Sequence, residues 1–430
     1  MIANMSGVKA VPKDRWLRII PPMILIYVIA YMDRMNIGFA IAGGMNETLG
    51  LTATIAGLAA GIFFVGYIVL QIHGGHIAEH GSAKKFIFWT ILAWGGISIL
   101  TGFVQNEWQL LVMRFLLGVA EGGVWPAILV SISNWFPAKE CGRANAFFMT
   151  SLALAAVITN PFTGWIVEKF DWRWVFFIEG GISLGLIFVW TPLFSDHPRD
   201  AKWISKEEKE YLEETLHKEK EAFTSQVRGS GYYKQLLRDR NLWMLTAIYF
   251  CNQVGQYGFL LWLPTILRDL TKMGMTSVGF LSALPYIFAL LGLYVFPALA
   301  DKTMNRRRYT ALTEFGFGFC LFLSTQFPGQ IWLAYFFIVM TGVFTKAPAA
   351  VFWAMPRTLF TPGLSGAARG FINAIGNIGG FLGPFLVGWI STLSSMKAGV
   401  YSLAGFLFAG SLITVFLPKI TTGVQLERKE

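Results

Sequence analysis

The composition of this chain is that of a membrane protein. Of its 430 residues, 54% are hydrophobic and only 14% are charged, whereas an ordinary soluble domain has roughly 25% charged residues. A soluble fold could not bury this much apolar surface. The formal net charge of +10 would be compatible with nucleic-acid binding, but the basic residues gather in particular loops between the apolar runs, which is typical of membrane topology.

Apolar runs of about 20 residues, the length that a helix needs to cross the bilayer, recur along the whole chain. Their continuous apolarity, without strand-like alternation, excludes a transmembrane barrel and predicts helices. We predict twelve spans, at residues 19–40, 51–73, 86–104, 108–132, 144–166, 174–193, 241–266, 277–300, 309–327, 331–355, 370–391 and 398–418.

Lysine and arginine are distributed unevenly around these spans. Of the 35, 27 fall at the termini or in even-numbered loops, five fall in odd-numbered loops and three lie inside spans. By the positive-inside rule, this places both termini in the cytoplasm and makes the basic excess a topology signal, so we expect no nucleic-acid partner. The basic N-terminus leads into the first span without a small-residue cleavage site, which predicts a retained helix.

The one long polar stretch separates two halves of the chain. We predict an N-terminal six-helix bundle, a cytoplasmic linker and a C-terminal six-helix bundle, at residues 1–194, 195–240 and 241–430. In the linker, Ser205 and Glu208 form a capping-box pattern, and Glu214 and Lys218 are an i,i+4 pair, which together predict a short surface helix. We expect the linker to be a solvated tether without a site of its own.

The two halves repeat one charge pattern 222 residues apart. After the second and the eighth spans, a carboxylate is followed by a histidine or lysine and, five and six residues later, by two cations: Glu79, His80, Lys84 and Lys85, then Asp301, Lys302, Arg306 and Arg307. Repeats of this kind predict two pseudo-symmetric bundles with substrate between them near the middle of the membrane.

These paired loops resemble the signature of the Major Facilitator Superfamily. Residues 31–36 (YMDRMN) and 114–122 (RFLLGVAEG) resemble its anion:cation symporter family. The resemblance covers nearly the whole chain. It implies an all-α membrane protein with twelve transmembrane helices in two six-helix bundles, no cofactor, and symport of a small organic anion with protons. Bacterial members of that family transport galactonate, rhamnonate, tartrate and 4-hydroxyphenylacetate.

Ionisable residues inside the predicted spans are functional candidates, because they cost several kcal/mol unless they face a cavity or a partner. Asp33 and Arg34 lie late in the first span, and Arg114 and Glu121 share one face of the fourth. The two carboxylates are candidate proton carriers, with Arg114 as their neighbour, and the planar fork of Arg34 suits a substrate carboxylate. The alternative is a structural ion pair that joins helices.

The resemblance assigns proton transfer to the positions of Asp33 and Glu121 and substrate binding to that of Arg34. It adds four substrate-binding positions: Tyr31, Tyr67, Trp353 and Asn373. Polar residues of the seventh and eleventh spans could serve the hydroxyls of a polyol, although amides also join helices. These candidates are Asn252, Gln253, Gln256, Tyr257 and Asn377.

Lys346 in the tenth span lies seven residues before Trp353 on one helix face, where it could meet a second anionic group of the substrate or form a salt bridge to another helix. We expect Glu179 and Glu314 to be structural. Three histidines share a helical face, but they lie at the end of the second span and merge into the loop signature, so we expect no metal site. They are His73, His76 and His80.

We therefore predict a monomeric transporter of the bacterial inner membrane, surrounded by lipid, which imports a sugar acid of the aldonate type with protons. An aromatic-acid importer, in which Trp353, Tyr31 and Tyr67 stack a ring, and a dicarboxylate importer are alternatives. A drug/proton antiporter is disfavoured by the cations Arg34 and Lys346. A non-transporting membrane sensor would need a soluble output domain, and the longest polar segment is shorter than a usual domain. No set of residues with a nucleophile, a base and an orienting group indicates an enzyme.

Overall fold

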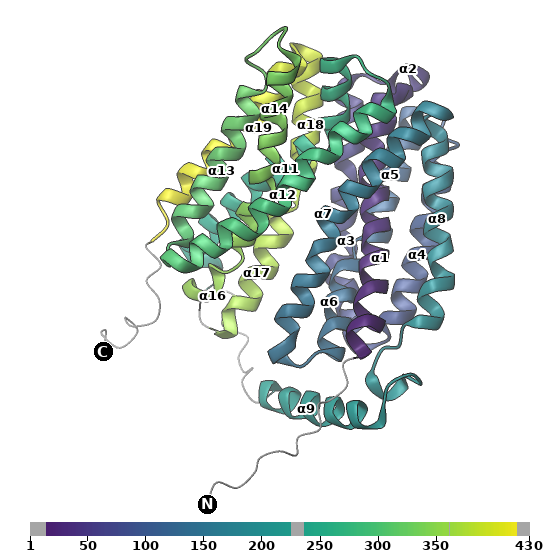
Figure 1. Ribbon diagram of the computed structural model, residues 1–430, viewed down its shortest axis with the longest axis vertical. Helices are drawn as coiled ribbons and strands as arrows, with labels where there is room; N and C mark the ends of the chain where they lie inside the picture. The colour runs from purple at the N-terminus through teal and green to yellow at the C-terminus, as the bar shows by residue number, and fades with distance from the viewer. Residues whose placement is uncertain (1–13, 225–235, 361, 419–430) are drawn as a thin grey trace, which may run out of the picture.

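The structure is a computed structural model that describes residues 14–224, 236–360 and 362–418. Within these ranges the elements are all helices. Figure 1 shows two groups of helices that lie side by side, with the helix α9 across one end of the molecule. The all-α fold of two six-helix bundles that the sequence predicts is therefore confirmed.

The N-terminal group is formed by α1 (Asp14–Ala40) continued by η1 (Ile41–Met45) and α2 (Asn46–Leu49), α3 (Ala53–His80), α4 (Ala83–Thr101), α5 (Glu107–Glu121) continued by α6 (Val124–Trp135), α7 (Ala138–Lys169) and α8 (Trp172–Leu193). The C-terminal group is formed by α11 (Arg240–Thr271), α12 (Met275–Thr303), α13 (Arg306–Leu323), α14 (Ile331–Thr345) continued by α15 (Ala347–Phe352), the short α16 (Pro356–Leu359), α17 (Pro362–Gly376) continued by α18 (Ile378–Leu393), and α19 (Met396–Val415). The twelve predicted spans coincide with these units.

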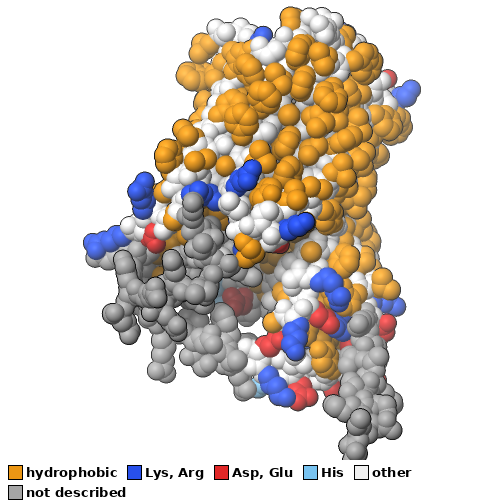
Figure 2. All heavy atoms as spheres, turned by 60° about the vertical axis from the view of Figure 1, so that its left-hand side comes forward, with side chains coloured by type: hydrophobic (Ala, Val, Ile, Leu, Met, Phe, Trp, Pro, Cys, Tyr) orange, Lys and Arg blue, Asp and Glu red, His pale blue; other side chains and the backbone are white. Residues whose placement is uncertain are grey.

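Among the described residues, ten helices or continued helices are long and apolar enough to cross a membrane. The two other units are more polar, because α11 carries three buried amides and α13 begins with three arginines. Large hydrophobic side chains are exposed over the molecule, as at Leu17 and Phe188. On the face in Figure 2, hydrophobic side chains cover the upper part, and most charged ones gather toward the end that carries α9. Such a surface suits lipid around the helices and water at that end.

Two helices that face the centre are interrupted at charged residues. α5 ends at Glu121 and α6 begins three residues later, while Lys346 stands between α14 and α15. Gly122 permits the first break to pack tightly, since a Cβ there would lie 2.2 Å from the carbonyl oxygen of Tyr67. Interrupted helices inside a membrane protein are tolerated where they line a cavity or are buried in protein.

The two halves are closed against each other at the end remote from α9. There α3 packs on α18, and α7 packs on α12. Backbones approach closely, because a Cβ on Gly57 would lie 2.5 Å from the carbonyl oxygen of Pro384, and one on Gly164 would lie 2.4 Å from that of Met275. Thr54 also donates to Thr392 across this contact over 2.9 Å.

The linker forms α9 (Lys206–Thr224), preceded by the short helix η2 (Pro198–Asp200). The predicted surface helix is confirmed: Ser205 Oγ accepts from the Glu208 amide over 3.2 Å, and Lys218 bonds Glu214 over 2.5 Å. The Lys218 ammonium holds the pKa of the Glu214 carboxyl below its ordinary value.

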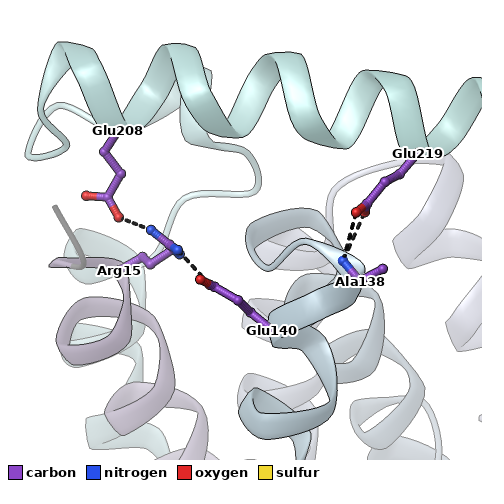
Figure 3. Close-up of polar contacts among 5 residues, drawn as sticks. All are labelled: Arg15, Ala138, Glu140, Glu208 and Glu219. Carbon is purple, nitrogen blue, oxygen red and sulfur yellow. Dashed lines mark hydrogen bonds and ion pairs between the residues drawn. The ribbon is translucent and has the colours of Figure 1, made fainter. Parts of the chain in front are cut away.

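The expectation of a solvated tether is wrong for α9, because one face of this helix is bound to the N-terminal half (Figure 3). The fully buried Glu208 forms an ion pair with Arg15 of α1, which also bonds Glu140 of α7 over 2.6 Å. Farther along α9, both carboxylate oxygens of Glu219 accept from the Ala138 amide, over 3.1 and 3.0 Å. The domain boundaries at residues 194 and 241 stay a prediction.

Candidate functional site

The centre of the N-terminal half holds a buried ion pair between α1 and α5. Arg34 Nη2 donates to Glu121 Oε2 over 3.3 Å, and the two residues are 4% and 1% exposed. The guanidinium carbon lies 5.6, 5.1 and 4.8 Å from the ring centres of Tyr31, Phe63 and Tyr67. In this apolar surrounding the attraction between the charges is stronger than in water, and the rings stabilise the cation further. The structure thus brings four of the predicted residues together.

Asp33 points away from this pair, although it adjoins Arg34 in the chain. Its Oδ1 accepts from Ser98 of α4 over 2.7 Å, and its Oδ2 accepts from Ser183 of α8 over 2.6 Å. Asn36 adds a longer bond of 3.4 Å. Consecutive helical residues point about 100° apart, so Asp33 and Arg34 face different neighbours. Asp33 therefore lies fully buried inside the N-terminal bundle, among α1, α4 and α8.

Arg114 interacts electrostatically with both carboxylates, but its hydrogen bonds go to backbone oxygens. Its Nη1 donates to the backbone oxygen of Asp33 over 3.3 Å, and its Nε donates to that of Ala59 over 3.4 Å. Its guanidinium carbon lies 5.3 Å from the ring centre of Phe63. Nη2 of Arg114 and Oε1 of Glu121 are both buried without a hydrogen-bond partner. This polar centre therefore keeps unused hydrogen-bonding capacity.

Lys346 reaches the same place from the C-terminal half. The residue is 8% exposed, and its Nζ lies 5.8 Å from the ring centre of Tyr31. Tyr31 is therefore close to both Arg34 and Lys346. Tyr257 of α11 interacts electrostatically with the same three residues. Within the described ranges, no aspartate or glutamate forms an ion pair with Lys346, which weakens the salt-bridge alternative.

The predicted amides of the C-terminal half form a chain that reaches the other half. Gln253 Nε2 donates to Asn377 Oδ1 over 3.1 Å, and Asn377 Nδ2 donates to Gln71 Oε1 of α3 over 3.4 Å. Asn252 is 2% exposed, and neither of its amide atoms has a partner. Gln256 is 8% exposed. These amides can therefore offer donors and acceptors to a bound polar molecule.

Trp353 and Asn373 belong to a separate cluster around Tyr249 of α11. The ring centres of Trp353 and Tyr249 lie 4.8 Å apart, and the Tyr249 hydroxyl donates to Asn373 Oδ1 over 3.4 Å. Among the described residues, the ring contacts of Trp353 are with Tyr249 and Phe352 and not with Tyr31 or Tyr67, although Tyr249 itself interacts electrostatically with Tyr67. Trp353 is thus not placed with the tyrosines that an aromatic substrate was expected to stack on.

Several residues of the polar centre were not among the sequence candidates. They are Tyr27, Phe63, Gln71 and Tyr286. Tyr27 precedes Tyr31 by one helical turn, so the shared face of α1 could have indicated it. Gln71 carried a signal as well, since an amide late in an apolar span needs a partner. Phe63 and Tyr286 gave none, because aromatic residues are common throughout these spans.

Comparison with known proteins places this arrangement among transporters. A "Putative tartrate transporter" of Agrobacterium vitis is 35% identical over 94% of this chain and 93% of its own. A "Quinolone resistance transporter" of Acinetobacter baumannii is 32% identical over 92% of both chains. A solved structure of a bacterial homologue of the human lysosomal transporter Spinster, inward-facing and occupied, has a TM-score of 0.74 at 14% identity and covers 94% of this chain and 97% of its own.

The sequence model of the Major Facilitator Superfamily matches residues 23–313 and 248–430. Together the two matches span almost the entire chain, in agreement with the observed pair of six-helix bundles. The matches to the two relatives, both named as transporters, cover more than 90% of each chain. The chain therefore belongs to the Major Facilitator Superfamily and is a multi-pass membrane transporter, not an enzyme.

Proposed function

We propose that this protein is a proton-coupled symporter that imports a small organic anion by alternating access. The observation that carries the proposal is the buried ion pair of Arg34 and Glu121. An arginine keeps its charge in proteins, whereas a glutamate can take up a proton. The pair therefore combines a permanent anion-binding group with a group that can be neutralised.

Coupling follows from competition for Arg34. Ionised Glu121 accepts a hydrogen bond from the Arg34 guanidinium over 3.3 Å, so it occupies a donor that a substrate carboxylate would otherwise use. A proton on Glu121 weakens this attraction and frees the guanidinium to bind a carboxylate with two parallel hydrogen bonds. Anion and proton then bind together. Asp33, which accepts from two serines, is the second proposed proton site, and Arg114 holds the backbone beside it.

The position of Lys346 bears on the substrate class. Arg34 and Lys346 approach the Tyr31 ring from the two halves, at 5.6 and 5.8 Å. Two cations near one ring repel each other unless an anion lies between them. This favours a hydroxylated dicarboxylate, and the relative in Agrobacterium vitis carries the name of a tartrate transporter. A monocarboxylic sugar acid is the second candidate, favoured by the free amide of Asn252.

Orientation follows from the charge distribution. The basic excess in the even-numbered loops places the termini and α9 in the cytoplasm. The closed end of the molecule then faces outward, and the structure corresponds to an inward-facing state in the bacterial inner membrane. We expect a monomer, with the domain boundaries given by the sequence.

A ligand screen followed by flux measurements tests the proposal. Tartrate, galactarate, galactonate, 4-hydroxyphenylacetate and a fluoroquinolone are compared by the thermal shift of the purified protein, because a ligand of the folded state raises its melting temperature. The stabilising anion is then followed into proteoliposomes with and without an inward proton gradient. Uptake that ignores the gradient contradicts symport. Stabilisation by the fluoroquinolone alone, with its export, would support a drug antiporter instead.

A further inference from the structure

A third carboxylate, Glu179, is buried beside Asp33. It lies in α8, seven residues or about 10 Å from the helix start, and it is fully buried. Its Oε1 accepts from Thr163 of α7 over 2.5 Å, while its Oε2 has no hydrogen-bond partner. The carboxylate of Asp33 acts on it electrostatically, and no ion pair among the described residues joins Glu179 to a cation. A buried carboxylate without a cation is costly to keep ionised.

Asn36 lies between the two carboxylates. Its Nδ2 donates to Asp33 Oδ1 over 3.4 Å, and its side chain also interacts with Glu179. Its Oδ1, like Glu179 Oε2, is a buried acceptor without a donor. Glu179 Oε2 is thus a buried acceptor in a polar cluster, and a proton bound there would remove the cost of leaving it unpaired.

The two carboxylates have unequal surroundings. Asp33 accepts from two serine hydroxyls at 2.7 and 2.6 Å and from Asn36, which favours its ionised form. Glu179 accepts one short hydrogen bond, from Thr163 over 2.5 Å, and has a weaker interaction with Asn36, so its ionised form is less well supported than that of Asp33. Interacting carboxyl groups titrate as a coupled pair, so a change in the surroundings of one during the transport cycle can move the shared proton to the other.

We propose that Glu179 is a third proton-binding residue of the transporter, which exchanges its proton with Asp33 during the transport cycle. In the exchange the O–H bond of Glu179 breaks, an O–H bond forms on Asp33, and the negative charge moves from Asp33 to Glu179. Ser183, one turn after Glu179 on α8 and bonded to Asp33, lies along the same face. Glu179 thereby lies between Asp33 and the closed, outward end. The inference rests on the proposed proton symport.

The Glu179→Gln variant separates this role from a structural one. Glutamine resembles protonated glutamate in shape and keeps a donor, so a purely structural residue would leave transport unchanged. If Glu179 exchanges protons, gradient-driven accumulation falls at least tenfold, while exchange of labelled for unlabelled anion continues. The matched control is Glu314→Gln in α13, where a fully buried carboxylate also has an unpartnered Oε2 in the other half. This control is expected to retain both activities.

The outcomes are distinguishable from failure of the proposed function. If the wild-type protein shows no gradient-driven accumulation, symport itself is contradicted. If wild-type symport holds and Glu179→Gln accumulates anion normally, Glu179 is not a proton site. Loss of both accumulation and exchange in Glu179→Gln, with an unchanged melting temperature, also overturns the inference, because it shows a role in conformational change rather than in proton transfer.

Discussion

Replacement of Arg34 by lysine keeps the positive charge but removes the planar fork. A carboxylate that receives two parallel hydrogen bonds from the guanidinium receives one from an ammonium. One lost hydrogen bond to a charged group costs about 1.5–3 kcal/mol, which corresponds to a Kd about 10- to 150-fold higher. The rings of Tyr31, Phe63 and Tyr67, at 4.8–5.6 Å, also lose their stacked guanidinium. Isothermal titration of Arg34→Lys with the anion found in the ligand screen measures this loss.

Arg173→Lys is the matched control. Its guanidinium also lies over an aromatic ring, 4.3 Å from the centre of Trp172, and bonds the carbonyl oxygens of Gly102 and Val104. Because Arg173 lies at the closed end and its hydrogen bonds go to backbone oxygens there, its replacement should leave the Kd unchanged. A Kd within twofold of wild type in Arg34→Lys, at an unchanged melting temperature, would refute the assignment of Arg34 to the substrate carboxylate.

Three further changes test other parts of the mechanism. Glu121→Gln resembles the state in which Glu121 is protonated, so the affinity for the anion should lose its pH dependence. Gradient-driven accumulation of the anion should stop, while exchange of labelled for unlabelled anion continues. Normal uphill accumulation in proteoliposomes would exclude Glu121 as the coupled proton site. In the same titrations, Lys346→Met should weaken binding of dicarboxylates at least tenfold more than binding of monocarboxylates. Lys346→Gln should bind a monocarboxylic polyol more tightly than Lys346→Met does, because glutamine keeps a hydrogen-bond donor. Equal effects on all anions count against a contact between Lys346 and the substrate. Gly57→Ala places a Cβ 2.5 Å from the backbone oxygen of Pro384, and overpacking of this kind costs about 1–3 kcal/mol. Distances between spin labels on the two halves at the closed end should therefore lengthen. Unchanged distances would show that the local structure accommodates the methyl group.

The membrane-spanning helices could be predicted from sequence because apolar length and charge placement are local properties. The contacts of the site depended on tertiary structure. Arg34 and Glu121 are 87 residues apart in the chain, and nothing in the spacing shows which partner each would meet. The helical period predicts that Asp33 and Arg34 point in different directions, but it does not identify Ser98 and Ser183 as the residues that donate to Asp33. The site roles themselves stay predictions.

The linker shows the same limit in another form. Its helix was predictable from Ser205 and from the pair of Glu214 and Lys218, all within one local segment. Its docking was not, because the partner of Glu208 is Arg15, 193 residues away. A solvated charged helix and a docked one can have the same local sequence pattern, because the contacts that dock α9, through Glu208, Glu219 and the buried Leu212, are made with residues far away in the chain.

The two halves contribute different buried polar residues to the proposed site, which suggests different roles for the halves in binding the proton and the anion. Asp33, Glu121 and Glu179 all belong to the N-terminal half, while Lys346 and the free amide of Asn252 belong to the C-terminal half. The breaks at Glu121 and Lys346 both occur in the fourth span of a half, and the two residues carry opposite charges. Under the proposed function, a proton that neutralises Glu121 would release Arg34 on one side of the anion, and Lys346 would contact the same anion from the other side. In the proposed cycle, the anion therefore replaces Glu121 as the negative charge between two cations, and this replacement is what draws the halves together around the loaded site.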